Sequence, residues 1–240
     1  MDFTYLEIAK MIDHALLAPM LSIEELVHGC ALARRYDVAS VCILPYFVKT
    51  ASEVLAGSTV LPTTTIGFPH GGHATRVKVA EAVQALNDGA RELDLVINIS
   101  QVKSRVLDYV ENEIREVLEA THGRGQKLKV IFENCYLDDD EKVALCGICG
   151  TLGVDWIKTS TGYGTGGATD ADLKLMRDHS PPGVQVKAAG GIRSFARLLE
   201  VRALGATRVG ASGTAQILEE CRAALGLPPL LPPAAAPAGY

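Results

Sequence analysis

The sequence predicts one α/β domain in which eight strand–helix units close into a (β/α)8, or TIM, barrel. Seven short runs rich in apolar and β-branched residues alternate with longer segments of helical periodicity. The runs are nearly continuous in apolar character, as expected for parallel strands that are covered on both faces. Dividing 240 residues among eight units leaves 30 residues for each, which suits this fold. An open, doubly wound sheet is the alternative architecture.

The strands follow one another along the whole chain. The first is expected within MIDHALL (11–17), although IDHALL is equally compatible with a helix. The seven clearer runs are VASVCIL (38–44), TTTIGF (63–68), ELDLVINI (92–99), KLKVIFE (127–133), DWIKTS (155–160), VQVKAA (184–189) and RVGAS (208–212). Helical periodicity is clear in 75–90 and 195–206, and glycines at 89, 153 and 205 mark helix ends before strands.

Composition places the barrel in residues 1–225 and leaves 226–240 as a flexible tail rich in proline and alanine. The chain is 48% hydrophobic with a net charge of −5, so it lacks a basic surface for nucleic acid. No apolar run reaches the roughly 20 residues of a membrane span, and the first residues do not form a secretion signal. Six cysteines in a chain of this length do not indicate a disulfide framework, so we expect a reduced, cytoplasmic protein.

Ionisable residues interrupt the apolar runs near their carboxyl ends, where barrel enzymes place their active groups. The clearest are Asp94, Lys158 and Lys187, and Lys129 and Glu133 form a second pair within one run. Lysine and aspartate are rarely buried without a partner, so a structural ion network in the barrel centre is one interpretation. Three such residues on different strands, each followed by a polar loop, favour catalysis.

Two lysines on neighbouring strands indicate a specific chemistry. With an unperturbed pKa near 10.4, roughly one lysine in 2,500 is neutral at pH 7, but burial and a second cation both lower that pKa. Lys158 and Lys187 lie on the sixth and seventh predicted strands. A neutral lysine forms a Schiff base with a carbonyl, and the protonated imine accepts electrons during carbon–carbon cleavage. Asp94 is placed to move protons or orient a water.

The loops after the last two strands have the composition of an anion site. AAGGIRS (188–194) and GASGT (210–214) both lead into helices, where barrel enzymes commonly bind phosphate. Glycines that only permit tight turns would explain one such loop, but two adjacent ones favour phosphate. The candidate ligands for a substrate phosphate are Gly162, Gly190, Gly191, Arg193, Gly210 and Ser212.

Three other motifs are weaker than they look. GYGTGG (162–167) matches a dinucleotide fingerprint, yet the next strand carries Lys187 where an acidic residue is required. Cys146 and Cys149 form a lone C-x-x-C without a second pair for zinc, and packing explains them better than redox chemistry. His70 and His73 have no evident third ligand. We therefore expect neither a metal nor a cofactor.

Taken together, the motifs resemble the deoxyribose-phosphate aldolases, a family of class I (Schiff-base) aldolases, along nearly the whole chain up to the tail. The matching segments are IDHALL (12–17), VCILP (41–45), IGFPHG (66–71), ELDLVIN (92–98), KVIFE (129–133), IKTSTGYGTGGAT (157–169) and VKAAGGIR (186–193). The resemblance implies that Lys158 forms the Schiff base, Lys187 lowers its pKa and Asp94 relays protons. It also implies a barrel that is dimeric or tetrameric.

The implied reaction is reversible cleavage of 2-deoxy-D-ribose 5-phosphate to D-glyceraldehyde 3-phosphate and acetaldehyde, in deoxyribonucleotide catabolism. Sugar phosphates and aldehydes are then the small-molecule partners. The chain departs from the family pattern at Ala15, usually threonine, while Asp13 of the same motif is retained as a substrate-site residue. Tyr163 stands where some members carry a lysine, so phosphate binding would rest more on Arg193 and the backbone. Tyr240 matches a terminal tyrosine that assists proton transfer in many members.

Two functions of other classes remain alternatives. A sugar-phosphate isomerase or epimerase would use the same phosphate loops with Asp94 as its base. A non-catalytic phosphosugar-binding protein would keep the barrel and lose turnover. Covalent trapping on a lysine separates the aldolase from both.

Overall fold

The computed structural model describes residues 3–230 and contains the closed barrel that the sequence predicts. Each strand pairs in parallel with the next, and β8 pairs with β1 to complete the ring. The eight strands are β1 (Ile12–Leu16), β2 (Ser40–Ile43), β3 (Leu61–Ile66), β4 (Glu92–Val96), β5 (Lys127–Ile131), β6 (Trp156–Lys158), β7 (Gln185–Ala189) and β8 (Ala206–Ala211). The (β/α)8 prediction is confirmed, including a strand within residues 11–17, and the open-sheet alternative is wrong.

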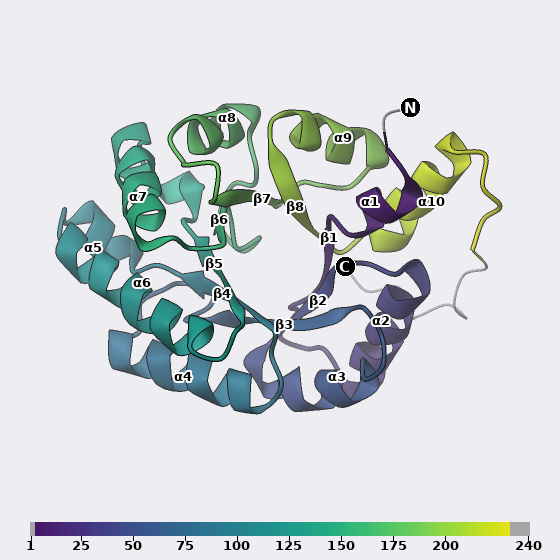
Figure 1. The fold of residues 1–240 in the computed structure, drawn as a ribbon, viewed down its shortest axis with the longest axis horizontal. Helices are drawn as coiled ribbons and strands as arrows, with labels where there is room; N and C mark the ends of the chain where they lie inside the picture. Colours follow the sequence, from purple (N-terminus) through teal and green to yellow (C-terminus); the bar gives the residue numbers. More distant parts are fainter. Residues whose placement is uncertain (1–2, 231–240) are drawn as a thin grey trace.

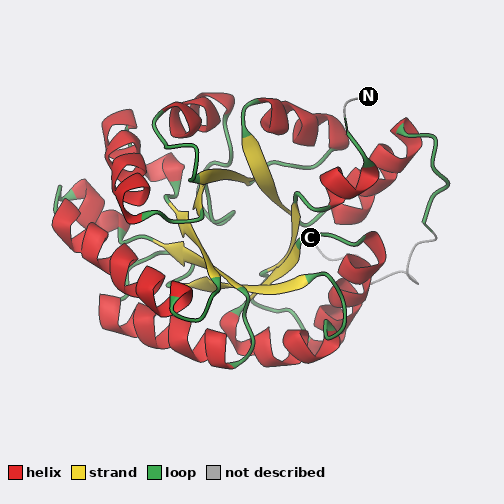
Figure 2. Cartoon of the chain, viewed as in Figure 1, coloured by secondary structure: helices red, strands yellow, loops and turns green. Residues whose placement is uncertain are grey.

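Helices surround the barrel, as Figures 1 and 2 show, with the strands forming an inner ring. They are α1 (Tyr5–Ala9), α2 (Ile23–Tyr36), α3 (Val48–Val54), α4 (Thr75–Asn87), α5 (Ile99–Lys103), α6 (Leu107–His122), α7 (Asp139–Leu152), α8 (Asp170–Asp178), α9 (Phe195–Ala203) and α10 (Thr214–Ala224), with short 3-10 turns at Pro45–Phe47 and Asn134–Tyr136. The predicted helical segments 75–90 and 195–206 contain α4 and α9. Within residues 3–230, no helix is long and apolar enough to cross a membrane.

The alternation of side chains along the strands separates an apolar layer from a polar interior. Leu93 and Leu95 pack with the helices, and Asp94 between them takes part in ion pairs inside the barrel. On β6, Ile157 likewise belongs to the apolar layer, and Lys158 forms an ion pair inside the barrel. The fold is therefore stabilised mainly by the layer between strands and helices, and the barrel centre is free to hold charged groups.

Six of the seven clearer runs end as strands one to three residues earlier than the sequence predicts, and two of these ends lie at the candidate site. Residues 159 and 160 of the predicted run 155–160 lie beyond β6, where the Thr159 hydroxyl exchanges hydrogen bonds of 3.1 Å with the backbone of Ala189. The predicted run 127–133 ends as a strand at Ile131, and Glu133 adopts a left-handed conformation with φ 56°. Backbone hydrogen bonds still join these segments, from Thr159 to Lys187 at 3.2 Å and from Asn134 to Thr159 at 2.9 Å, and side-chain hydrogen bonds are added to them at the barrel mouth.

The first residues of the predicted tail contact α10. The Arg222 guanidinium donates to the carbonyl of Pro228 at 2.8 Å, and the backbone N–H of Leu230 donates to Glu219 at 3.0 Å. Leu230 also packs against the apolar core. Residues 226–230 are thus held against the barrel, and the rest of the tail, including Tyr240, lies outside the described residues.

Candidate active site

Asp94, Lys158 and Lys187 come together inside the barrel. Lys158 and Lys187 are direct neighbours in the register of β6 and β7, as their adjacent predicted strands require. Each ammonium lies 2.8 Å from the same oxygen, Oδ2 of Asp94. All three side chains are buried, with only 3% of the Lys158 side chain exposed. The two amines and one carboxylate therefore form a compact unit.

A second group of charges surrounds this unit. Lys129 lies 2.9 Å from Oδ1 of Asp94 and 2.5 Å from Glu92. Arg208 bridges Glu92 at 3.0 Å and Asp13 at 2.6 Å. Every carboxylate of this network contacts at least two cations, whereas Lys158 is paired with a single carboxylate.

Asp13 closes the network on the other side. Its Oδ2 lies 2.5 Å from Nζ of Lys187, and its Oδ1 accepts a hydrogen bond of 2.7 Å from the Ser40 hydroxyl. These contacts form the buried ion network that a structural role for the charged residues predicts. The same network contains Asp94, Lys158 and Lys187, which the catalytic hypothesis names. Asp13 lies in this buried network, and on the barrel wall it pairs in register with Gly210 of β8.

The surroundings push the two lysine pKa values in opposite directions. Burial lowers the pKa of Lys158, and the charge of Lys187 lowers it further against the opposing attraction of Asp94. Burial also disfavours the charged form of Lys187, but Asp13 and Asp94 outweigh it and raise the pKa of Lys187. Lys158 is thus the amine that loses its proton more readily, and Lys187 remains an ammonium beside it.

The carboxylate between them stays ionised. Burial alone would raise the pKa of Asp94, but Lys129, Lys158 and Lys187 hold it well below its usual range. An ionised Asp94 accepts protons and cannot donate one until it has taken one from substrate or water. The arrangement places an amine whose pKa is lowered beside a cation and a proton acceptor within hydrogen-bond distance.

Lys129 and Glu133, which the sequence groups as a pair, have different partners. Lys129 belongs to the ion network, whereas the Glu133 carboxylate accepts hydrogen bonds from the backbone N–H and hydroxyl of Thr161. Glu133 is nearly fully buried and follows β5. It therefore fixes the loop that follows β6, where Gly162 lies.

The loops after β6, β7 and β8 meet at the barrel mouth. Gly162, Gly190 and Gly191 have positive φ angles of 91°, 83° and 85°, which favour glycine. A Cβ on Gly190 would lie 2.8 Å from Cα of Gly167, so the β6 and β7 loops touch through their backbones. Gly162 and Gly191 face open space on the side where a Cβ would lie. Exposed backbone is therefore available for an anion.

The helix after β8 adds to this surface. Gly213 caps α10 without a side-chain hydrogen bond, so the first N–H groups of that helix are not bonded to a capping side chain. Ser212 and Arg193 are exposed beside these loops, and Gly210 is half-buried at the end of β8. The structure thus places five of the six candidate phosphate ligands in the loops after three adjacent strands, and the sixth, Gly210, near the end of β8.

Comparisons with known proteins agree with this geometry. The DeoC/LacD family aldolase model matches residues 7–223. The chain belongs to this family of aldolases. It is 61% identical to a deoxyribose-phosphate aldolase of Rhodopirellula baltica over 100% of this chain and 99% of that one. It is 48% identical to one of Caldanaerobacter subterraneus over 90% and 94% of the two chains.

A solved structure of this kind has the same fold. The tetrameric deoxyribose phosphate aldolase of Aeropyrum pernix superposes with a TM-score of 0.85 at 28% identity, covering 92% of this chain and 93% of that one. The resemblance inferred from the motifs is confirmed, and the protein is an enzyme, a lyase of the aldolase class.

Tyr163 lies at the barrel mouth, at the position where some members of the family carry a lysine. Its hydroxyl donates to the carbonyl of Leu17 at 2.7 Å, and its ring packs edge-to-face on Phe68 with centroids 5.4 Å apart. The side chain thus connects the loop after β6 with those after β1 and β3. Ala15, the other departure, pairs in register with Cys42 on β2.

Three buried hydroxyls in this aldolase have no hydrogen-bond partner among the described residues, those of Thr65, Ser160 and Ser180, and the first two lie near the site. Thr65 is the register neighbour of Asp94, and Ser160 lies between the two threonines that anchor the β6 loop. The sequence analysis did not single out Thr65. Its signal is the threonine run at the end of β3, where an apolar strand would continue with valine or isoleucine.

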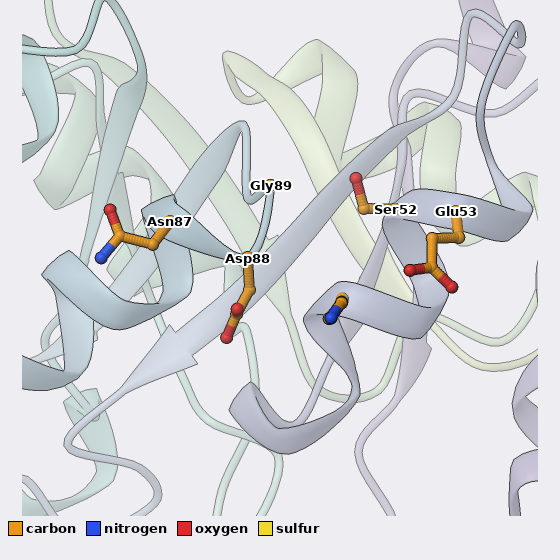
Figure 3. Close-up of a pocket in the computed structure, with 6 residues that line it drawn as sticks. Ser52, Glu53, Asn87, Asp88 and Gly89 are labelled. Atoms are coloured by element: carbon orange, nitrogen blue, oxygen red, sulfur yellow. The ribbon is translucent and has the colours of Figure 1, made fainter.

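Two hollows lie at different places on this aldolase. One of about 190 Å³ lies at the barrel mouth and is lined by residues that include His70, Glu133, Thr161 and Tyr163. Another of about 420 Å³ lies between α3 and the turn that leads from α4 to β4 (Figure 3). The second is at the amino ends of the strands, away from the lysines, and we assign it no role in the chemistry.

Metal and cysteine motifs contribute little to the site of this aldolase. In residues 3–230, no group of three or more His, Cys, Asp or Glu side chains could hold a metal ion. His70 and His73 are exposed in the loop after β3. Cys146 and Cys149 are buried in α7, where burial raises the pKa of the Cys146 thiol to about 11. Such thiols pack as small apolar groups.

Proposed function

We propose that this aldolase reversibly cleaves 2-deoxy-D-ribose 5-phosphate to D-glyceraldehyde 3-phosphate and acetaldehyde through a Schiff base on Lys158. The observation that carries the proposal is the pair of buried lysines that share one oxygen of Asp94, with Lys158 the less firmly held. The relatives named deoxyribose-phosphate aldolases support the choice of substrate.

The chemistry begins with the neutral amine of Lys158. It attacks the C1 carbonyl of the open-chain sugar, and loss of water gives an iminium ion. As the C3 hydroxyl loses its proton, the electron pair of the C2–C3 bond moves toward the iminium nitrogen. D-glyceraldehyde 3-phosphate leaves, and a C1–C2 enamine remains on the lysine. Protonation at C2 and hydrolysis release acetaldehyde and the free amine.

Asp94 and Lys187 act on this sequence in different ways. Asp94, 2.8 Å from the Lys158 amine, accepts and returns protons directly or through a water. Lys187, held as an ammonium by Asp13 and Asp94, disfavours protonation of Lys158. The acid–base function and the electrostatic function thus rest on different residues.

The phosphate of the substrate is proposed to bind at the loops after β6, β7 and β8. Backbone N–H groups near Gly162, Gly190 and Gly191 and at the start of α10 are the main ligands, with Arg193 and Ser212 beside them. Tyr163 carries no charge to contribute, so binding rests on the backbone and on Arg193. Gly210 lets the β8 backbone lie close to Ala189, whose Cβ would be 3.3 Å from an added methyl group.

Several further features belong to the same proposal. The enzyme acts without metal or cofactor, because the iminium ion accepts the electrons. Asp13 acts in the substrate site through Lys187, and Tyr240 assists proton transfer at C2. We infer a homo-oligomer, since the Aeropyrum pernix relative is described as tetrameric. Six free thiols, five of them buried, support a reducing cytoplasmic environment.

Borohydride trapping tests the proposal directly. Incubation with acetaldehyde and borohydride is expected to add one ethyl group, which peptide mapping places on Lys158, and Lys158→Ala folds but does not trap. Turnover should persist in a chelator. An adduct on Lys187 would reverse the roles of the two lysines. Absence of any adduct in the folded protein would favour the isomerase or epimerase alternative, with Asp94 as base.

A further inference from the structure

The ion network in the barrel contains equal numbers of acidic and basic groups once Lys158 is set aside. The carboxylates are Asp13, Glu92 and Asp94, and the cations are Lys129, Lys187 and Arg208. The network therefore has no net charge when the amine of Lys158 is neutral, and a charge of +1 when it is protonated. A buried net charge is unfavourable because water cannot solvate it.

Glu92 and Arg208 take part in this balance from a distance. Arg208 contacts Glu92 through both terminal nitrogens, at 3.0 and 3.2 Å, and packs over the Trp156 ring, 4.8 Å from its centroid. Glu92 lies two residues before Asp94 on β4, and Arg208 lies two residues before Gly210 on β8. Within residues 3–230, neither forms an ion pair or hydrogen bond with Lys158, so both act through the charge of the network.

We propose that Glu92 and Arg208 are positioning residues that set the protonation of Lys158 in opposite directions through the net charge of the buried network, with Arg208 favouring the neutral, nucleophilic amine and Glu92 limiting that effect. This inference rests on the proposed Schiff-base function and deepens it. The reason is electrostatic: each residue contributes one unit charge to a network whose charges sum to zero only while Lys158 is uncharged. Removing either one alters the balance, and removing both restores it.

The ionisation of the other members supports this count. Burial opposes the charge of Asp13, but Arg208, Lys129 and Lys187 hold its pKa well below the usual range. Carboxylates outweigh burial to raise the pKa values of Lys129 and Arg208. Each group therefore keeps its charge near neutral pH.

The remaining groups near Lys158 form no ion pair with the network among the described residues. Burial raises the pKa of the Cys42 thiol on β2 to about 11, so that it is neutral. On β3, Thr63 contributes a hydroxyl 3.4 Å from Glu92. Glu133 lies beyond β5 and, within residues 3–230, forms hydrogen bonds to Thr161 and no ion pair.

The test measures the titration of Lys158 in the full-length protein. Reductive alkylation by acetaldehyde and cyanoborohydride is followed at Lys158 by peptide mass spectrometry as a function of pH. A unit charge roughly 10 Å away, at an effective dielectric constant of about 20, shifts a pKa by about one unit. The acid limb is the pH range in which alkylation falls because Lys158 becomes protonated. Glu92→Gln should move this limb to lower pH by about one unit, and Arg208→Gln should move it to higher pH by about one unit.

The double variant Glu92→Gln/Arg208→Gln supplies the decisive control, because its limb should return to within about 0.3 unit of wild type. Glu92→Asp and Arg208→Lys keep the charges and should leave the limb in place even where thermal stability falls. Limbs that do not move, or that move in the same direction in both single variants, overturn the inference.

Failure of the two proposals is distinguishable. A folded wild-type protein that is not alkylated at Lys158 contradicts the Schiff-base function itself. A wild-type protein that titrates normally while the variants do not shift contradicts only the charge balance. Circular dichroism confirms folding of each variant. If Arg208→Gln does not fold, the nearly isosteric Glu92→Gln decides alone, and if neither single variant folds, a shifted limb in the double variant overturns the inference.

Discussion

Two buried lysines, one outside the barrel and one inside it, have different surroundings. Lys78 on α4 pairs with Glu113 of α6 at 2.8 Å, and both side chains are fully buried. Lys78 also donates to the carbonyl of Val96 at 2.8 Å, and Glu113 accepts from the backbone N–H of Asn98 at 2.9 Å. Each charge has a partner of its own, and the pair joins two helices to the loop after β4.

Lys158 is bound less completely. Its only ion pair among the described residues is with Asp94, whose oxygen Lys187 also contacts. Burial lowers the pKa of both Lys78 and Lys158, so a lowered pKa does not by itself identify a nucleophile. The difference lies in the dedicated acid beside Lys78 and in the position of Lys158 at the carboxyl end of a barrel strand. A reactive lysine needs a weak hold and a route to substrate.

The largest expected contrast comes from replacing each lysine with methionine. Lys158→Met should abolish trapping and turnover because no amine remains to form the imine. Its stability should change by no more than about 1 kcal/mol, since Asp94 keeps Lys129 and Lys187 as partners. Activity and the free energy of unfolding in urea are the measurements. Residual trapping at another lysine would show that the site is less specific than this comparison implies.

Replacing the shared carboxylate should have the next largest effect. Asp94→Asn keeps the size and removes the proton acceptor, so turnover should fall by about 10²–10⁴-fold. Imine formation should be impaired less, because the amine still attacks the carbonyl. Pre-steady-state trapping compared with steady-state turnover separates the two steps. A variant within about twofold of wild type would make Asp94 a structural residue, like Glu113.

Lys187 offers a smaller change of defined sign. Its charge lowers the pKa of Lys158, so Lys187→Leu should raise that pKa and move the acid limb of activity to higher pH. Below the limb, the neutral fraction of Lys158 falls about tenfold for each unit that its pKa rises. The pH–rate profile measures the effect. Full activity with an unchanged profile would contradict the role of Lys187.

The sequence predicts the inner residues of this site better than the outer ones, for physical reasons. Asp94, Lys158 and Lys187 stand out because each interrupts an apolar run of a buried strand. Glu92 and Arg208 stand at or near the starts of their strands, where a charged residue normally faces solvent. Their pairing also requires β4 and β8, which are 116 residues apart, to face each other across the closed barrel.

Local geometry at the mouth is hidden from the sequence for a related reason. Glu133 reaches Thr161 because its backbone turns into the left-handed region, which no pattern of apolar residues indicates. From the sequence, a structural ion network and a catalytic site are two alternative interpretations of the same charged residues. In the barrel the residues of both interpretations form one cluster, and in our proposal its ions also set the protonation of Lys158.

The smallest effect on chemistry is expected at Lys78, where the effect on stability should be the largest. Lys78→Met leaves Glu113 buried without its cation, and breaking such a pair costs about 3–5 kcal/mol. The double variant Lys78→Met/Glu113→Leu removes both charges and should recover much of that loss. Urea denaturation of the two single variants and the double variant measures the coupling, while trapping at Lys158 in folded protein should keep its acid limb. If the limb moved with Lys78→Met, the two buried lysines would belong to one electrostatic system. If the double variant were as unstable as the single ones, the pair would contribute through packing of its long side chains rather than through charge.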